Sequence, residues 1–78
     1  MARLRLFGPA REASGVSSLT LPGSDVGAVI AAAEARFGEE FVRMLGVSKV
    51  WLNGEDAERS ATVTEHDEVA IIPPVSGG

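Results

Sequence analysis

The residues whose types and spacing suggest chemistry lie at the end of the chain. There, Pro73-Pro74-Val75-Ser76-Gly77-Gly78 follows the apolar, strand-like run Val69–Ile72. Proline fixes φ and favours an extended path, whereas glycine has no side chain and adopts most backbone conformations. Six extended residues reach at most about 20 Å. The pattern predicts a stiff and slim terminal segment, 73–78, that can place the Gly78 carboxylate inside a pocket of another protein.

The composition limits both the size of the fold and its chemistry. The chain has 78 residues, of which 45% are hydrophobic, so we expect one domain, 1–78, with a small core. It contains no cysteine, which excludes a disulfide framework, a cysteine-ligated metal and a thiol nucleophile. If the protein takes part in sulfur chemistry, the sulfur must come from another molecule.

Charge and hydropathy narrow the classes of partner. The net charge of −4 and the pI of about 4.8 argue against nucleic acid and anionic membranes. No apolar run reaches the roughly 18 residues of a membrane-spanning helix, and no signal peptide is visible, so we expect a cytoplasmic protein. The single histidine, His66, needs several converging carboxylates to bind a metal. We therefore expect no bound metal or cofactor. Because the sequence shows no nucleophile–base pair, phosphate loop or metal cluster, we also expect no independent enzyme activity.

Hydrophobic periodicity predicts the elements that position the terminal segment. A period of 3.6 residues predicts one main helix that begins at an N-cap, Asp25 or alternatively Ser24, and ends at Gly38. Asn53-Gly54 is a strong signal for a type I′ turn. Alternation predicts strands over Ala2–Phe7, Val16–Leu21, Val47–Leu52, Glu55–Ala57 and Glu68–Ile72.

The remaining segments are expected to be less regular. Gly8–Gly15 is a connection that could hold one helical turn between Pro9 and Ser14, and Glu39–Gly46 is expected to be a short, irregular helical turn. Ala61–Asp67 is expected to be a polar loop with Val63 turned inward.

The order of the elements favours an α+β fold. One helix must cover one face of one sheet, and the first and last strands can lie side by side and parallel at its centre. This is the ubiquitin-like β-grasp arrangement. We expect a mixed sheet of four to five strands, one main covering helix and a flexible C-terminal tail.

Three segments are recognisable: 6–15, LFGPAREASG; 50–54, VWLNG; and 67–78, DEVAIIPPVSGG. Together they resemble the small, sulfur-carrying subunit of molybdopterin synthase, the MoaD family, within the MoaD/ThiS ubiquitin-like superfamily. The resemblance runs the length of the chain, and the ending is its most specific part.

The resemblance implies a definite reaction cycle. An adenylating enzyme related to ubiquitin activators would use ATP and magnesium to convert the Gly78 carboxylate into an acyl-adenylate. A persulfide donor would then replace AMP with sulfur and leave a thiocarboxylate. The terminal segment would insert into the large synthase subunit, in a heterotetramer, and give its sulfur to a cyclic pyranopterin monophosphate. An acyl-adenylate hydrolyses in water, so it must form in a closed pocket that only a slim segment can enter.

A partner-binding patch is expected from Phe7, Arg11 and Ile72. Phe7 shares the face of two arginines in its predicted strand, so it either packs under the next loop or stays available to a partner. Arg11 could pair with a partner carboxylate or remain solvated.

One turn departs from the family. Members often carry glycine before the last strand, where this chain has Glu65-His66-Asp67. We therefore expect His66 to accept the geometry of that turn, including a positive φ.

Other functions remain open at the level of the sequence. Related carriers serve thiamin, cysteine or tRNA sulfuration, and a ubiquitin-like protein modifier would also begin with adenylation of Gly78. A plain interaction domain with an incidental terminus is a further alternative, because glycine is common at chain ends.

Overall fold

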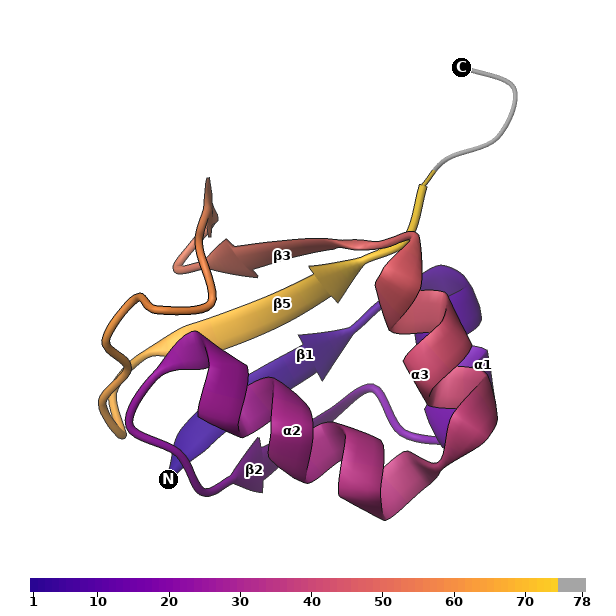
Figure 1. The fold of residues 1–78 in the computed structure, drawn as a ribbon, viewed down its shortest axis with the longest axis horizontal. Helices are drawn as coiled ribbons and strands as arrows, with labels where there is room; N and C mark the ends of the chain where they lie inside the picture. Colours follow the sequence, from indigo (N-terminus) through magenta and orange to yellow (C-terminus); the bar gives the residue numbers. More distant parts are fainter. Residues whose placement is uncertain (75–78) are drawn as a thin grey trace.

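The computed structural model describes residues 1–74 (Figure 1). Within them the elements are β1 (Ala2–Leu6), α1 (Gly8–Ser14), β2 (Ser18–Leu21), α2 (Val26–Phe37), α3 (Glu39–Gly46), β3 (Lys49–Leu52), β4 (Glu55–Asp56) and β5 (Glu68–Ile72). Val75, Ser76, Gly77 and Gly78, together with the predicted flexibility of the tail, lie outside the described residues.

β5 occupies the centre of a single mixed sheet. The strand order is β2-β1-β5-β3-β4, and β5 pairs in parallel with β1 and antiparallel with β3. Figure 1 shows β1 and β5 side by side with their arrows in the same direction. The β-grasp prediction, with parallel first and last strands at the centre, is confirmed.

One face of this sheet forms the core. In the register of β1 and β5, Leu4 lies opposite Val69 and Leu6 opposite Ile71, and all four side chains are buried. Each fully buried aliphatic side chain of this kind contributes about 1.5–3 kcal/mol. The other buried apolar residues come from β1, β2, all three helices and the loop before β5: Ala2, Ala10, Leu21, Val26, Val29, Ile30, Ala33, Phe41, Leu45 and Val63.

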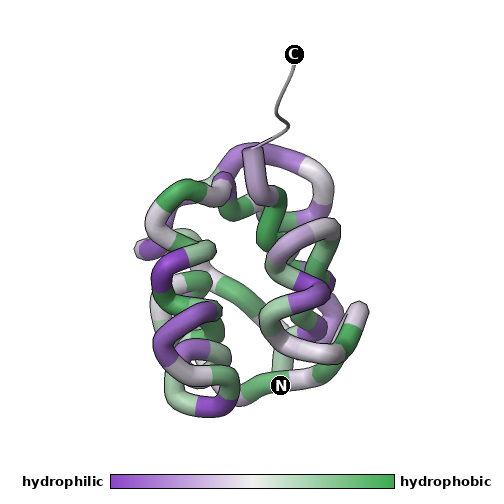
Figure 2. Tube along the Cα trace, turned by 90° about the vertical axis from the view of Figure 1, so that its right-hand side faces the viewer, coloured by the Kyte–Doolittle hydropathy of each residue, from purple (hydrophilic) through white to green (hydrophobic). Residues whose placement is uncertain are grey.

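α2 is the main covering helix. The Asp25 carboxylate accepts a hydrogen bond of 2.7 Å from the backbone N–H of Ala28, which identifies Asp25 rather than Ser24 as the N-cap. Hydrophobic and hydrophilic residues alternate within the turns of the helices in Figure 2, as expected for helices with one face on a core.

The connection after β1 is a helix of seven residues, not a single turn. Pro9 lies in the first turn of α1, where its missing N–H is not needed, and Ala10 is fully buried. Gly15 closes the helix with φ 81°, and its N–H donates to the Arg11 carbonyl at 2.8 Å. The sequence prediction underestimated this element because a short helix with one buried residue shows almost no periodicity.

The segment after α2 is also a regular helix, which corrects the prediction of an irregular turn. Gly38 adopts φ 90°, so the chain changes direction there and α3 begins at Glu39. Phe41 and Leu45, one turn apart, are both buried, and the Phe41 ring lies 5.0 Å from that of Phe37. The main helix therefore shares the cover of the sheet with α1 and α3.

Four predicted strands are shorter than expected. β1 ends at Leu6 rather than Phe7, because Phe7 is the N-cap of α1. β2 begins at Ser18 because the Ser14 hydroxyl binds both the N–H and the carbonyl of Val16 and holds it in a turn. β3 begins at Lys49 because the Ser48 hydroxyl donates to the Met44 carbonyl and extends the end of α3. β4 retains only Glu55–Asp56.

Polar contacts join the β3–β4 turn to the loop before β5. Asn53 has φ 52° and Gly54 φ 86°, as a type I′ turn requires. The Asn53 side chain donates to the Asp67 carboxylate at 2.9 Å and accepts from the Glu68 N–H at 2.9 Å. The other Asp67 oxygen accepts from the N–H and hydroxyl of Thr64 at 2.8 and 3.1 Å. These bonds fix where the central strand begins.

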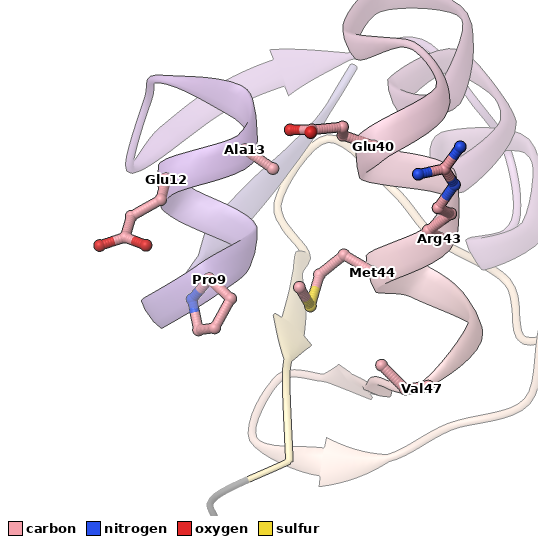
Figure 3. A pocket seen from close by; sticks show the side chains of 7 residues that line it. All are labelled: Pro9, Glu12, Ala13, Glu40, Arg43, Met44 and Val47. Carbon is pink, nitrogen blue, oxygen red and sulfur yellow. The ribbon is translucent and has the colours of Figure 1, made fainter.

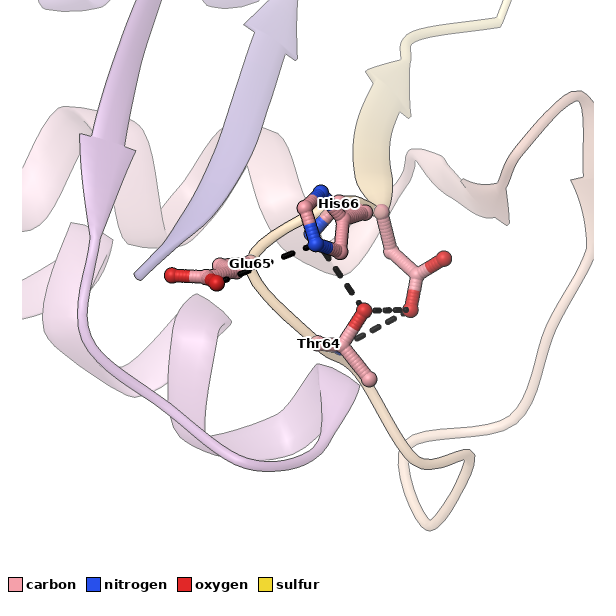
Figure 4. A network of polar contacts seen from close by, with 4 residues as sticks. Thr64, Glu65 and His66 are labelled. Carbon is pink, nitrogen blue, oxygen red and sulfur yellow. Dashed lines mark hydrogen bonds and ion pairs between the residues drawn. The ribbon is translucent and has the colours of Figure 1, made fainter.

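His66 does not need the expected backbone geometry. Asn53 is the non-glycine residue with positive φ in the described part of the chain, so the prediction for His66 was wrong. The His66 N–H bonds to the Thr64 hydroxyl, as Figure 4 shows, and its ring lies 3.7 Å from the Glu65 carboxylate in solvent. The turn is stabilised by hydrogen bonds rather than by glycine.

The substitution Gly23→Ala should destabilise the fold by about 1–3 kcal/mol. Gly23 has φ 151°, and a Cβ there would lie 2.8 Å from the Val29 nitrogen and 2.9 Å from its Cγ2. Urea denaturation measures the effect. Gly46→Ala is the control, because a Cβ at Gly46 meets no atom within 4 Å. Equal midpoints for the two variants would contradict this reading of Gly23.

The substitution Asp67→Asn should destabilise the protein at neutral pH and lose its effect in acid. Hydrogen bonds from Asn53, and then from the backbone and side chain of Thr64, lower the pKa of Asp67 from its ordinary 3.8. A lowered carboxyl pKa stabilises the fold above about pH 4, and this stability disappears as the pH falls through the folded-state pKa.

Urea midpoints measured between neutral pH and about pH 2 test this expectation. The control is Asp56→Asn, since the exposed Asp56 side chain makes no hydrogen bond or ion pair within residues 1–74. A constant difference between Asp67→Asn and the parent at every pH would show that the charge of Asp67 is irrelevant.

Candidate functional site

The terminal segment begins at a fixed point of the fold. Ile72, the last residue of β5, pairs with Lys49, while β1 holds the other edge of β5. Pro73 is buried and Pro74 is exposed. The chain therefore leaves the domain from a strand that is hydrogen-bonded on both sides, and the base of the segment cannot fray as an ordinary terminus does.

An apolar patch lies on the uncovered face of the sheet beside this exit. Trp51 lies opposite Ala70, and Ile72 follows two residues later on the same face. Phe7 comes directly after Leu6, whose partner on β5 is Ile71, so Phe7 reaches the same end of the sheet. We call Phe7, Trp51, Ala70 and Ile72 the outer patch. The Phe7 side chain is exposed, and the other three are half-buried.

Phe7 is kept on the surface rather than packed under the next loop. It is 42% exposed and serves as the N-cap residue of α1 without a side-chain hydrogen bond. The Arg5 guanidinium lies 5.5 Å from the centre of its ring and 3.9 Å from the Glu68 carboxylate. Arg5 therefore lies between an exposed aromatic ring and a carboxylate, which favours the second reading of Phe7, an apolar contact for a partner.

The outer patch contains two residues that the sequence reasoning missed, Trp51 and Ala70. Their position follows from the β3–β5 register, which the sequence alone does not give. Trp51 Nε1 is buried and has no hydrogen-bond partner among the described residues. Asp56 lies opposite Trp51 on the edge strand and adds a carboxylate to the same face. The patch is thus apolar at its centre and charged at its margin.

Arg11 is joined to Phe7, another predicted patch residue, through the backbone: its N–H donates to the Phe7 carbonyl at 3.4 Å. It lies in the last turn of α1 and is exposed. Within residues 1–74 its side chain makes no hydrogen bond or ion pair, although its carbonyl accepts from Gly15 and from the Ser14 hydroxyl. Its role as a partner contact stays a prediction.

The described residues carry little chemistry of their own. Between Met1 and Pro74 no group of three or more histidine, cysteine, aspartate or glutamate residues is placed to hold a metal ion. In the same range no helix has both the length and the apolar character needed to cross a membrane. What this part of the chain can do is anchor a terminal segment and present an apolar surface beside it.

Comparison with known proteins supports this description. Residues 4–78 match the ThiS family. The molybdopterin synthase sulfur carrier subunit of Arabidopsis thaliana is 41% identical over 80 residues, which covers 97% of this chain and 81% of that protein.

Solved structures show the same fold. SAMP1 from Haloferax volcanii superposes with a TM-score of 0.84 at 28% identity, covering 99% of this chain and 98% of that one. The small archaeal modifier protein 1 from Methanosarcina acetivorans has a TM-score of 0.81 at 26% identity, with 99% and 95% covered. The complex of subunits 1 and 2 of the molybdopterin-converting factor from Helicobacter pylori matches with a TM-score of 0.76 at 24% identity, with 99% and 97% covered.

The family match spans residues 4–78, and the sheet with β5 at its centre agrees with it. The chain therefore belongs to the ThiS family and is a ubiquitin-like sulfur carrier of the MoaD/ThiS type.

Proposed function

We propose that this carrier is the small subunit of a molybdopterin synthase and that its Gly78 carboxyl group carries the sulfur. The observation that supports this most strongly is the 41% identity to a molybdopterin synthase sulfur carrier subunit over 97% of the chain. The structure adds a physical reason, because the central strand leads directly into the terminal segment beside an exposed apolar patch.

The proposed chemistry has three steps. A partner adenylating enzyme with ATP and magnesium joins AMP to the Gly78 carboxylate and releases pyrophosphate. The terminal sulfur of a persulfide on a sulfurtransferase attacks the activated carbonyl, a C–S bond forms, and AMP leaves. A thiol then cleaves the resulting acyl disulfide, so that the thiocarboxylate is released and the sulfurtransferase sulfur ends in a disulfide.

The large synthase subunit would use this thiocarboxylate. The terminal segment, residues 73–78, enters its active site and gives sulfur to a cyclic pyranopterin monophosphate, and the Gly78 carboxylate is regenerated. Six extended residues span at most about 20 Å. Because this reach is short, the large subunit must contact the domain surface around Pro73. Because the cycle consumes ATP, we assign it to the cytoplasm.

The outer patch and Arg11 would form the docking surface for this subunit. Phe7 and Ile72 flank the exit of the terminal segment, and apolar anchors near the centre of an interface carry most of its binding energy. The Helicobacter pylori structure is a complex of subunits 1 and 2, and we propose that this chain likewise binds a large subunit, in a heterotetramer of two small and two large subunits.

A second candidate is a protein modifier. The two SAMP1 structures are 28% and 26% identical to this chain, and the name of that protein refers to modification. Both functions need an activated Gly78, but a modifier would form an isopeptide bond with a lysine. Immunoblots of cells that express a tagged chain would show adducts of higher mass only in the second case.

Deleting Gly78 should abolish sulfur loading. Incubation with the adenylating enzyme, ATP, magnesium and a persulfide donor should convert the parent chain to a species heavier by one sulfur-for-oxygen exchange, as measured by intact-protein mass spectrometry. The shortened chain should keep its mass and its denaturation midpoint. A parent chain that remains a carboxylate under these conditions would refute the carrier function.

The substitution Phe7→Ala should weaken binding of the large subunit by about tenfold, because it removes an apolar anchor beside the exit of the terminal segment. Isothermal titration calorimetry measures this effect. Val42→Ala is the matched control, since Val42 and Phe7 are both 42% exposed and Val42 lies on α3, outside the outer patch. Equal affinities of the two variants would remove Phe7 from the interface.

A further inference from the structure

A groove of about 450 Å³ separates α1 from α3. Pro9 and Ala13 of α1 and Met44 and Val47 at the end of α3 give it apolar walls. Figure 3 shows the Met44 side chain between the two helices. Val47 is 62% exposed, which is unusual for a valine in a chain with so small a core. The groove is therefore an open apolar surface on the helical side, distinct from the outer patch on the sheet.

The groove opens at the same end of the domain as the terminal segment. Val47 stands two residues before Lys49, which pairs with Ile72 at the end of β5. Pro9 stands two residues after Phe7, at the end of the strand that pairs with the other edge of β5. In Figure 3 the end of β5 is seen below the gap between α1 and α3, close to Pro9 and Val47. The outer patch and the groove thus flank one exit.

The carboxylate that faces the groove is that of Glu40. Glu12 belongs to α1 and Glu40 to α3, and both are exposed. In Figure 3 Glu40 points from α3 toward α1, near Ala13, whereas Arg43 points away from α1 and Glu12 points away from α3. The ion pairs within residues 1–74 are Arg5–Glu68 and His66–Glu65, so neither carboxylate is neutralised by this chain.

This charge argues against a second copy of the chain as the occupant. Two copies joined through their grooves would bring carboxylates together on molecules that each carry a net charge of −4. A partner with a basic side chain beside an apolar one fits both the charge and the apolar walls. A partner that accepts the terminal segment must also come within about 20 Å of Pro73, where that segment begins. The groove opens at this end of the domain.

We infer that the α1–α3 groove is a second docking site for the large synthase subunit, which inserts an apolar side chain over Met44 and Val47 and a lysine or arginine beside Glu40. The inference rests on the proposed function and names a further contact surface for it. The large subunit would then hold the domain from both sides of the exit, and this would fix the direction in which residues 73–78 enter the active site.

The test is calorimetric binding of the purified, cognate large subunit to charge-reversal variants. Glu40→Lys should weaken binding by about tenfold, because it places two cations together. Glu58→Lys makes the same change in net charge at an exposed site in the loop after β4 and should alter affinity by less than about twofold. Glu40→Gln should also reduce the salt dependence of binding, which a loss of folding would not do.

The apolar part of the groove has its own matched pair. Val47→Ser should weaken binding by about threefold to tenfold, whereas Val42→Ser, on α3 outside the groove, should not change it. Both valines are exposed, so both variants should keep the parental denaturation midpoint.

Three results would overturn the inference. Groove variants that bind like their controls would remove the groove from the interface and leave the proposed function intact. A parent chain that fails to bind the large subunit would refute both. Weakened binding of the adenylating enzyme by Glu40→Lys, with unchanged binding of the large subunit, would assign the groove to a different partner.

Discussion

The pairing of β5 with a strand on each side is the interaction on which the structure depends. β1 and β3 lie far apart in the sequence, and both are bonded to the last strand of the chain. The buried residues Val69 and Ile71 complete the core from the same strand. The last few residues of most domains are poorly ordered unless they are tied down. Here the loss of β5 would open the core and detach the base of the terminal segment together.

This arrangement separates stability from chemistry. The core face of the sheet holds the domain together, while Gly78, the residue proposed to carry sulfur, follows six residues after the last strand in the sequence. The adenylating enzyme would supply a closed pocket in which ATP activates the carboxylate. The large synthase subunit would bind the pterin that accepts the sulfur. The carrier itself then needs a well-paired last strand, a slim terminal segment and surfaces around the exit to which a partner can bind. The exposed Phe7 beside Arg5 is the clearest of these surfaces, because a ring kept in solvent does nothing for the core.

The sequence predicted the features that depend on local pattern. Alternation in β1 and β5, the period of α2 with its Asp25 cap, and the Asn53-Gly54 turn are all found in the structure. It did not predict the length of α1, because a helix that buries only Ala10 shows almost no periodicity. It did not predict the regularity of α3, because this helix depends on the change of direction at Gly38.

For the candidate site, the sequence supplied Phe7 and Ile72 but not Trp51, because strand register arises from tertiary pairing. The turn at His66 shows the opposite error. The expected backbone strain is replaced by hydrogen bonds from Thr64 and Asn53 to Asp67, which no spacing rule reveals.

Transfer of sulfur from Gly78 in a single turnover tests the central claim most directly. The chain can be made with a thiocarboxylate at Gly78 by intein cleavage and mixed with the large subunit and cyclic pyranopterin monophosphate. The account predicts that each thiocarboxylate is consumed, that Gly78 returns to a carboxylate, and that the dithiolene product appears in proportion. A thiocarboxylate that stays intact in the assembled complex, with no sulfur in the pterin, would contradict it.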